Sequence, residues 1–141
     1  MKRNSVKLCA AVVLAAACSS APQPGDPGYS YNLSGVYQAE FLADDGSAFR
    51  GTAEVETLAG GLVSGSMNLV DPMVIAGPLE GEIVGAQLSL EVRYSIPDTG
   101  CGGVASGSGV IEEGGVAVAG TVAIVDECGD APPAASFTLS R

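Results

Sequence analysis

Short runs in which apolar and polar residues alternate dominate the chain from residue 35 onward. The clearest run covers residues 87–96, where every second residue is apolar from Leu88 to Ile96. A period of two is typical of a β-strand with one buried face. Eight such runs are predicted as strands, at residues 35–43, 49–57, 62–70, 77–84, 87–96, 104–112, 116–125 and 135–140.

The connections between these runs decide the fold class. They are short, rich in Gly, Pro and Asp, and leave no room for a crossover helix. Eight antiparallel strands joined locally favour an up-and-down β-barrel, which leaves no unpaired edge strand. A two-sheet β-sandwich of the same strands is the alternative. Either all-β domain spans residues 31–141.

Alternating strand direction sorts the connections onto two ends of this domain. The turns near 58–61, 84–86 and 113–115 are short and share one end. The connections near 44–48, 71–77, 97–103 and 126–134 share the other end, and most of them are longer. The chain enters its first strand at the short-turn end.

The first residues are predicted to direct export of the protein and not to form part of its fold. Lys2, Arg3 and Lys7 precede an apolar run that ends at Ala17, which is typical of a secretory signal peptide over residues 1–17. The run is too short to anchor a protein by spanning a bilayer, which takes about 20 apolar residues.

Residues 14–18, Leu-Ala-Ala-Ala-Cys, resemble the lipobox of bacterial lipoproteins. The resemblance implies that the signal is cut before Cys18 and that this cysteine is lipidated with acyl chains such as palmitate. Residues 18–30 contain three prolines and would be a flexible tether. The expected location is the cell envelope, with a membrane contact through the lipid. Because Ser19 rather than Asp follows the cysteine, the outer membrane is favoured in a Gram-negative organism. A secreted soluble protein is the alternative.

Two cysteines remain in the barrel domain, Cys101 and Cys128. Both fall in predicted loops at the same end. In an oxidising envelope compartment such a pair is expected to form a disulfide.

Composition excludes several function classes. Beyond the signal, only Arg50, Arg93 and Arg141 oppose 16 acidic residues, so the domain would repel nucleic acid. The chain has no His, which removes the usual nucleophile activation and imidazole metal ligands. The acids within the strands alternate with the apolar residues and are expected to face solvent. We therefore expect no enzyme activity, no metal site and no cofactor.

The remaining classes are binding and structural roles. One is a protein-binding module that uses the long-loop end around Cys101 and Cys128, or the uncharged outer face expected over residues 104–140. The other is a carrier of a small apolar ligand. Its candidate cavity lining is Phe41, Phe49, Met67, Leu90 and Tyr94. An eight-stranded barrel interior is either filled by side chains or holds one small ligand, and both states stay open here.

The predicted architecture is similar to the lipocalin and avidin-like barrels. The chain has no Trp, whereas avidins place several around biotin, and Tyr37 stands where the lipocalin Gly-x-Trp start has its Trp. Neither family's ligand is therefore carried over to this chain.

Overall fold

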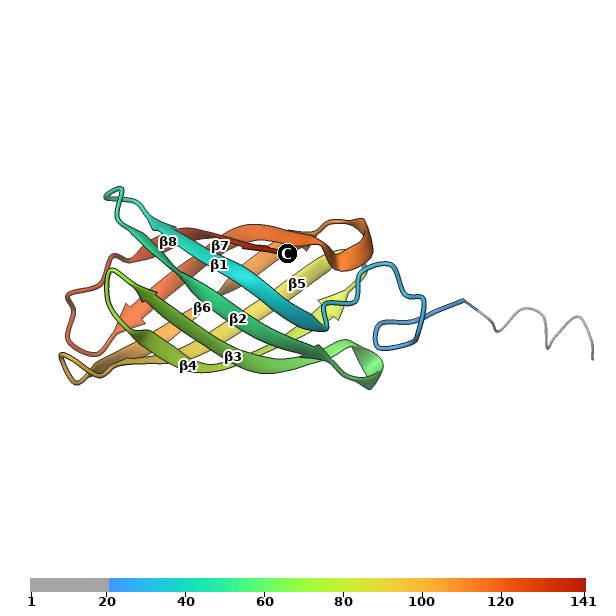
Figure 1. Ribbon diagram of the computed structural model, residues 1–141, viewed down its shortest axis with the longest axis horizontal. Coiled ribbons are helices and arrows are strands. Elements are labelled where there is room, and N and C mark those ends of the chain that lie inside the picture. Colours follow the sequence, from blue (N-terminus) through green and yellow to red (C-terminus); the bar gives the residue numbers. More distant parts are fainter. Residues whose placement is uncertain (1–20) are drawn as a thin grey trace, which may run out of the picture.

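The computed structural model describes residues 21–141, which form a closed antiparallel barrel (Figure 1). Its eight strands are hydrogen-bonded in chain order, and β8 closes on β1. The strands are β1 Gly35–Ala43, β2 Ala48–Thr57, β3 Leu62–Asp71, β4 Ile75–Val84, β5 Gln87–Ile96, β6 Cys101–Ile111, β7 Ala117–Asp126 and β8 Ala134–Ser140. Single turns of 3-10 helix, η1 Ala59–Gly61 and η2 Glu113–Gly115, precede β3 and β7. The predicted up-and-down β-barrel is confirmed, in place of the β-sandwich.

The alternation of apolar residues produces one continuous core inside the barrel. On β5, Leu88, Leu90, Val92 and Tyr94 are buried, whereas the residues between them point outward. Within residues 21–141 no charged side chain is buried. Tyr37 is fully buried, and its hydroxyl donates a 2.7 Å hydrogen bond to the carbonyl oxygen of Gly115. The burial of an uncompensated polar atom is thereby avoided.

Two strand boundaries differ from the sequence prediction. β6 begins at Cys101 rather than at 104, because residues 101–103 pair with residues 94–96 of β5. β4 begins at Ile75 rather than at 77, because residues 75–77 pair with residues 67–69 of β3. The extension of β6 contains glycine, and the extension of β4 lies beside a glycine and a proline. They therefore show no clear alternation of apolar residues, although their main chains pair with the neighbouring strand. The other boundaries shift by at most one residue.

Glycines within the strands mark places where neighbouring strands approach closely. Gly107 faces inward in the middle of β6, between Leu90 of β5 and Val122 of β7. A Cβ atom at this position would collide with the main-chain oxygen of Thr121. Glycine at such positions allows the strong coiling that closes a narrow barrel.

Gly107→Ala is expected to lower the free energy of unfolding by about 1–3 kcal/mol, because the added methyl group overlaps rigid main chain. The measurement is urea unfolding of residues 21–141. Ser108→Ala is the matched control, since Ser108 is exposed on the same strand, and its effect should stay within about 0.5 kcal/mol. A Gly107→Ala protein as stable as the control would contradict the prediction.

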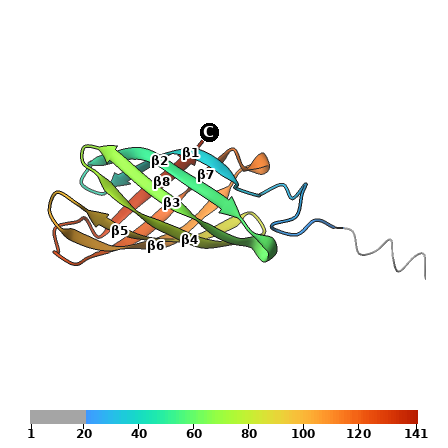
Figure 2. The ribbon, with the colours of Figure 1, turned by 60° about the horizontal axis from the view of Figure 1, so that its bottom comes forward.

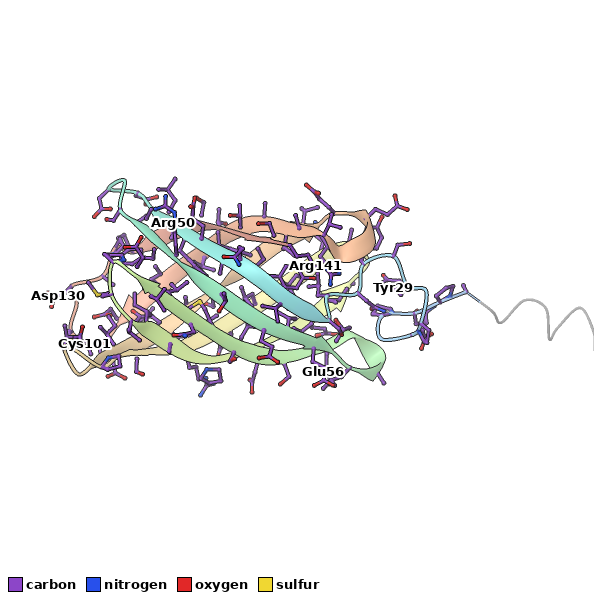
Figure 3. The ribbon with its side chains drawn as sticks, viewed as in Figure 1. Tyr29, Arg50, Glu56, Cys101, Asp130 and Arg141 are labelled. Carbon is purple, nitrogen blue, oxygen red and sulfur yellow. A yellow bond between two sulfur atoms is a disulfide. The ribbon has the colours of Figure 1, made fainter. Side chains whose placement is uncertain are left out.

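The two ends of the barrel are built differently. The turns that contain η1, residues 85–86 and η2 lie at one end, here called the short-turn end. The connections at 44–47, 72–74, 97–100 and 127–133 lie at the opposite, long-loop end, at the left of Figure 1. Figure 3 shows Cys101 and Asp130 at the long-loop end and Tyr29 at the short-turn end.

Residues 21–34 pack against the short-turn end (Figures 1 and 2). The Tyr29 hydroxyl donates a 2.9 Å hydrogen bond to the oxygen of Gly85, and the amide of Gly114 donates a 2.7 Å bond to the oxygen of Ser30. Leu33 is completely buried. These contacts cover the short-turn end of the core.

The predicted export signal and lipidation site precede the part of the chain that the structure describes. The signal peptide at residues 1–17 and the lipidation site Cys18 lie outside the described residues, which begin within the range predicted as a tether. From residue 21 onward, no helix has the length and apolarity needed to cross a bilayer.

The uncharged residues of β6, β7 and β8 share one outer face. Val110 lies opposite Ala119, which in turn lies opposite Thr138. Val110 and Val125 are 55% and 74% exposed. The face ends at the charged residues of the neighbouring strands, Glu40 on β1 and Glu91 on β5.

Candidate functional site: an apolar pocket at the long-loop end

A cavity of about 230 Å³ lies at the long-loop end of the barrel. Its walls are the inward residues at the ends of the strands, and its mouth is formed by the loops. Exposed residues such as Met73 and Asp130 belong to this mouth. The lining comprises Phe41, Ala43, Phe49, Met67, Leu69, Met73, Ile75, Tyr94, Ile96, Thr99, Cys101, Ala105, Ile124, Asp126, Asp130, Ala131, Pro132 and Ala135.

The barrel interior is hollow in one half and filled in the other. Small side chains on three strands, Ala43, Ala105 and Ala135, leave space in the long-loop half. The short-turn half is packed with fully buried larger side chains, among them Tyr37, Ile83 and Leu88. Both interior states considered from the sequence therefore occur, at different depths of the same barrel.

Four of the five residues predicted to line a cavity do so: Phe41, Phe49, Met67 and Tyr94. The fifth, Leu90, is buried in the core opposite Gly81 and Gly107 and does not reach the pocket. Alternation identifies which face of a strand is inward, but it does not identify the depth at which the barrel is hollow.

Sequence reasoning missed the lining that comes from strand ends and loops. Ile75, Ile96 and Ile124 are half-buried at the ends of their strands, and Ala131 and Pro132 belong to the β7–β8 connection. The sequence did contain a signal for this lining, namely apolar residues at the points where strands meet the long loops. In a barrel filled throughout, apolar residues would not be needed at these points.

The main polar feature of the pocket is the contact between Tyr94 and Asp126. The Tyr94 hydroxyl donates a 2.7 Å hydrogen bond to Oδ2 of Asp126. Oδ1 of the same carboxylate accepts a 2.9 Å bond from the amide of Cys128. The bond from Tyr94 lowers the pKa of Asp126, whereas burial, followed by this bond, raises the pKa of Tyr94. The pair is therefore a neutral phenol held against a carboxylate at neutral pH.

The disulfide predicted between Cys101 and Cys128 is present, with its Cα atoms 5.8 Å apart. Cys101 is the first residue of β6 and lines the pocket. Cys128 lies in the connection that contributes Asp130, Ala131 and Pro132 to the pocket wall. The bond thus fastens the β7–β8 connection to the start of β6 and fixes one side of the mouth.

The rim of the long-loop end is acidic. Its connections and strand ends carry Asp44, Asp45, Asp71, Asp98, Asp126, Glu127 and Asp130. Toward this end, Figure 3 shows the basic residue Arg50 of β2 on the outside of the barrel. Its Nε lies 2.6 Å from Oε2 of Glu40, so its charge is already paired. Within residues 21–141, no three acidic or cysteine side chains gather closely enough to hold a metal ion.

Comparisons with known proteins identify the fold and no family. No protein-family model matches the chain, and no curated protein matches it in sequence. Among solved structures, a redesigned β-barrel, mFAP1, bound to DFHBI has a TM-score of 0.60 at 16% identity, over 77% of this chain and 94% of that one. A fluorescence-activating β-barrel designed de novo has a TM-score of 0.56 at 15% identity, over 77% and 93%. At these identities the likeness concerns the barrel fold alone.

Proposed function

We propose that this barrel is a non-catalytic binding protein that holds one small apolar molecule in the pocket at its long-loop end. The observation that carries the proposal is the apolar cavity itself, open at one end of an otherwise packed barrel. An eight-stranded barrel is just wide enough to enclose such a ligand. One similar designed barrel is described in complex with a small molecule, DFHBI, which supports the same use of this fold.

The size of the cavity limits the ligand. An engineered apolar cavity of about 150 Å³ binds benzene, whereas pockets for drug-sized ligands span roughly 300–1,000 Å³. The volume of about 230 Å³ lies between these cases. The best fit is a compact molecule of one or two rings, or an aliphatic molecule of similar bulk.

We further propose that the protein is a lipoprotein of the cell envelope, anchored through Cys18 in the outer membrane where the organism has one. The sequence of residues 1–18 supports this location. The segment that precedes β1 lies at the short-turn end (Figure 1), whereas the residues that line the pocket lie toward the long-loop end. An N-terminal anchor would accordingly leave the mouth of the pocket facing away from the membrane.

Binding can be tested with a neutral naphthalene dye whose fluorescence rises in apolar surroundings, such as Prodan. The protein would be residues 21–141, which contain the whole barrel and its own core. Two variants reduce the cavity from different strands, Ala105→Leu and Ala43→Leu, and each should weaken dye affinity at least tenfold. Ala123→Leu adds the same side chain to the exposed outer face of β7 and should leave affinity within twofold.

Thermal unfolding of each variant shows whether it is folded during the titration. If the wild-type protein binds no dye, or if the pocket variants bind as tightly as Ala123→Leu, the proposed function is wrong.

A further inference from the structure

The polar side chains of the pocket can accept hydrogen bonds from a ligand, but their own hydrogen-bond donors are already engaged within the protein. Of the lining residues, only Tyr94, Thr99, Asp126 and Asp130 carry polar oxygen atoms in their side chains. Tyr94 donates its proton to Asp126. The hydroxyl of Thr99 donates a hydrogen bond to the main-chain oxygen of Ile96 at 3.4 Å and accepts one from the amide of Cys101 at 3.2 Å. The remaining capacity is the lone pairs of the phenol, the hydroxyl and the two carboxylates.

The basic residues of the barrel domain are all engaged elsewhere. Arg50 is paired with Glu40 and Arg93 with Glu91, both on the outside of the barrel. Arg141 lies over the ring of Tyr37, 5.1 Å from its centroid, and donates to the oxygen of Ser34 at the short-turn end. No arginine or lysine of the described chain lines the pocket. An anionic ligand would therefore meet carboxylates at the rim and no balancing charge.

The walls of the pocket are compatible with a positive charge. Phe41, Phe49 and Tyr94 present aromatic rings to the cavity, and ring faces attract cations. A charge deep in the apolar cavity would lose its hydration at high cost. At the mouth, however, Asp126 is only partly buried, so an ammonium group there can pair with the carboxylate and keep some water.

We infer that the pocket selects compact amphiphiles that carry a protonated amine, with the apolar body in the cavity and the ammonium group against Asp126 at the mouth. This inference rests on the proposed function and narrows the ligand to a chemical class. Neutral molecules of the same shape bind more weakly, and the corresponding carboxylates bind worst. Asp126 provides the specificity, and Tyr94 positions its carboxylate.

The experiment compares three probes with one apolar body: 1-naphthylmethylamine, 1-naphthylmethanol and 1-naphthoic acid. Each displaces Prodan from the wild-type protein at pH 7 and moderate salt, and the inhibition constants are compared. The amine is expected to bind about 5–20-fold more tightly than the alcohol, which corresponds to about 1–2 kcal/mol for a partly exposed pair of opposite charges. The acid should bind more weakly than the alcohol.

Asp126→Asn should remove most of the preference for the amine while leaving the affinity for the alcohol within about threefold. Asp44→Asn is the matched control, because it removes the same charge from the same end but does not line the pocket. It should change the affinity for the amine by less than twofold. Tyr94→Phe keeps the charge of Asp126 but removes the hydrogen bond that positions its carboxylate, so it should reduce the preference for the amine without reversing the order of the three probes.

The outcomes separate the two proposals. Equal affinity for the three probes, or strongest binding of the acid, would overturn the inference while leaving the pocket functional. Failure of Prodan and all three probes would overturn the proposed function as well. Equal losses in Asp126→Asn and Asp44→Asn would refute the assignment to Asp126, since the selectivity would then come from the general charge of the rim.

Discussion

Phe137→Ala is expected to destabilise the barrel by about 3–5 kcal/mol, the usual cost of removing a fully buried phenylalanine. Phe137 is 1% exposed on β8, and its ring stacks on that of Phe41 with the centroids 5.9 Å apart. The two residues are direct cross-strand partners where β8 closes on β1. Truncation would leave a void at the seam that completes the barrel.

Urea unfolding of residues 21–141, followed by circular dichroism, measures this loss. Thr138→Ala is a suitable control, because Thr138 is the next residue on β8 and points into solvent. Its effect should stay within about 0.5 kcal/mol. A loss below about 1 kcal/mol for Phe137→Ala would show that the ring is not packed as described, given the range for such truncations.

Phe137→Ala should also alter the pocket. Phe41 lines the cavity, whereas Phe137 lies against Phe41 and does not line it. Without Phe137, the ring of Phe41 loses its stacking partner and the cavity can extend toward the core. We expect the folded variant to bind bulkier naphthalene derivatives better, relative to Prodan, than the wild-type protein does.

Removing the disulfide is the second change with a large expected effect. Cys101 and Cys128 are 27 residues apart, and closing a loop of that length stabilises a protein by about 3.5 kcal/mol in the chain-entropy model. The double variant Cys101→Ala with Cys128→Ala should lose that amount in urea unfolding. It should also bind Prodan less tightly, because the β7–β8 connection supplies part of the pocket wall.

Reduction of the wild-type protein provides an independent comparison. Dithiothreitol should lower the stability of the wild-type protein toward that of the double variant and should not affect the double variant at all. Equal stability of the oxidised protein and the double variant would be evidence against the stabilising role of the bond.

The fold could be predicted from the sequence because each strand has a regular apolar face and each connection is local. The closure of β8 on β1 pairs the first and last strands, and it was predicted because closure leaves no unpaired edge strand. The N-terminal segment could not be placed in this way. Its contacts, such as the burial of Leu33 and the hydrogen bond from Tyr29 to Gly85, come from residues that show no alternation of apolar and polar positions.

The candidate site was predictable only in part. The inward faces of β1, β2, β3 and β5 led to Phe41, Phe49, Met67 and Tyr94, which line the pocket. Leu90 obeys the same alternation and lies in the filled half instead. The contact between Tyr94 and Asp126 joins β5 and β7, which are not adjacent; both residues lie opposite Gly103 of β6, and this register could not be predicted from the alternation of single strands.

Because the barrel has a filled half and a hollow half, requirements for stability and for ligand recognition act on different parts of the same strands. Large, fully buried side chains such as Tyr37, Ile83 and Leu88 fill the half that the N-terminal segment covers, whereas the proposed ligand contacts lie in the other half, where the disulfide holds the loops. Substitutions of exposed residues at the pocket mouth, such as Met73 and Asp130, can therefore change which ligand would fit while leaving the filled half of the core and the disulfide intact. The same arrangement would suit protein engineering, because the mouth residues could be varied for new ligands on an unchanged barrel.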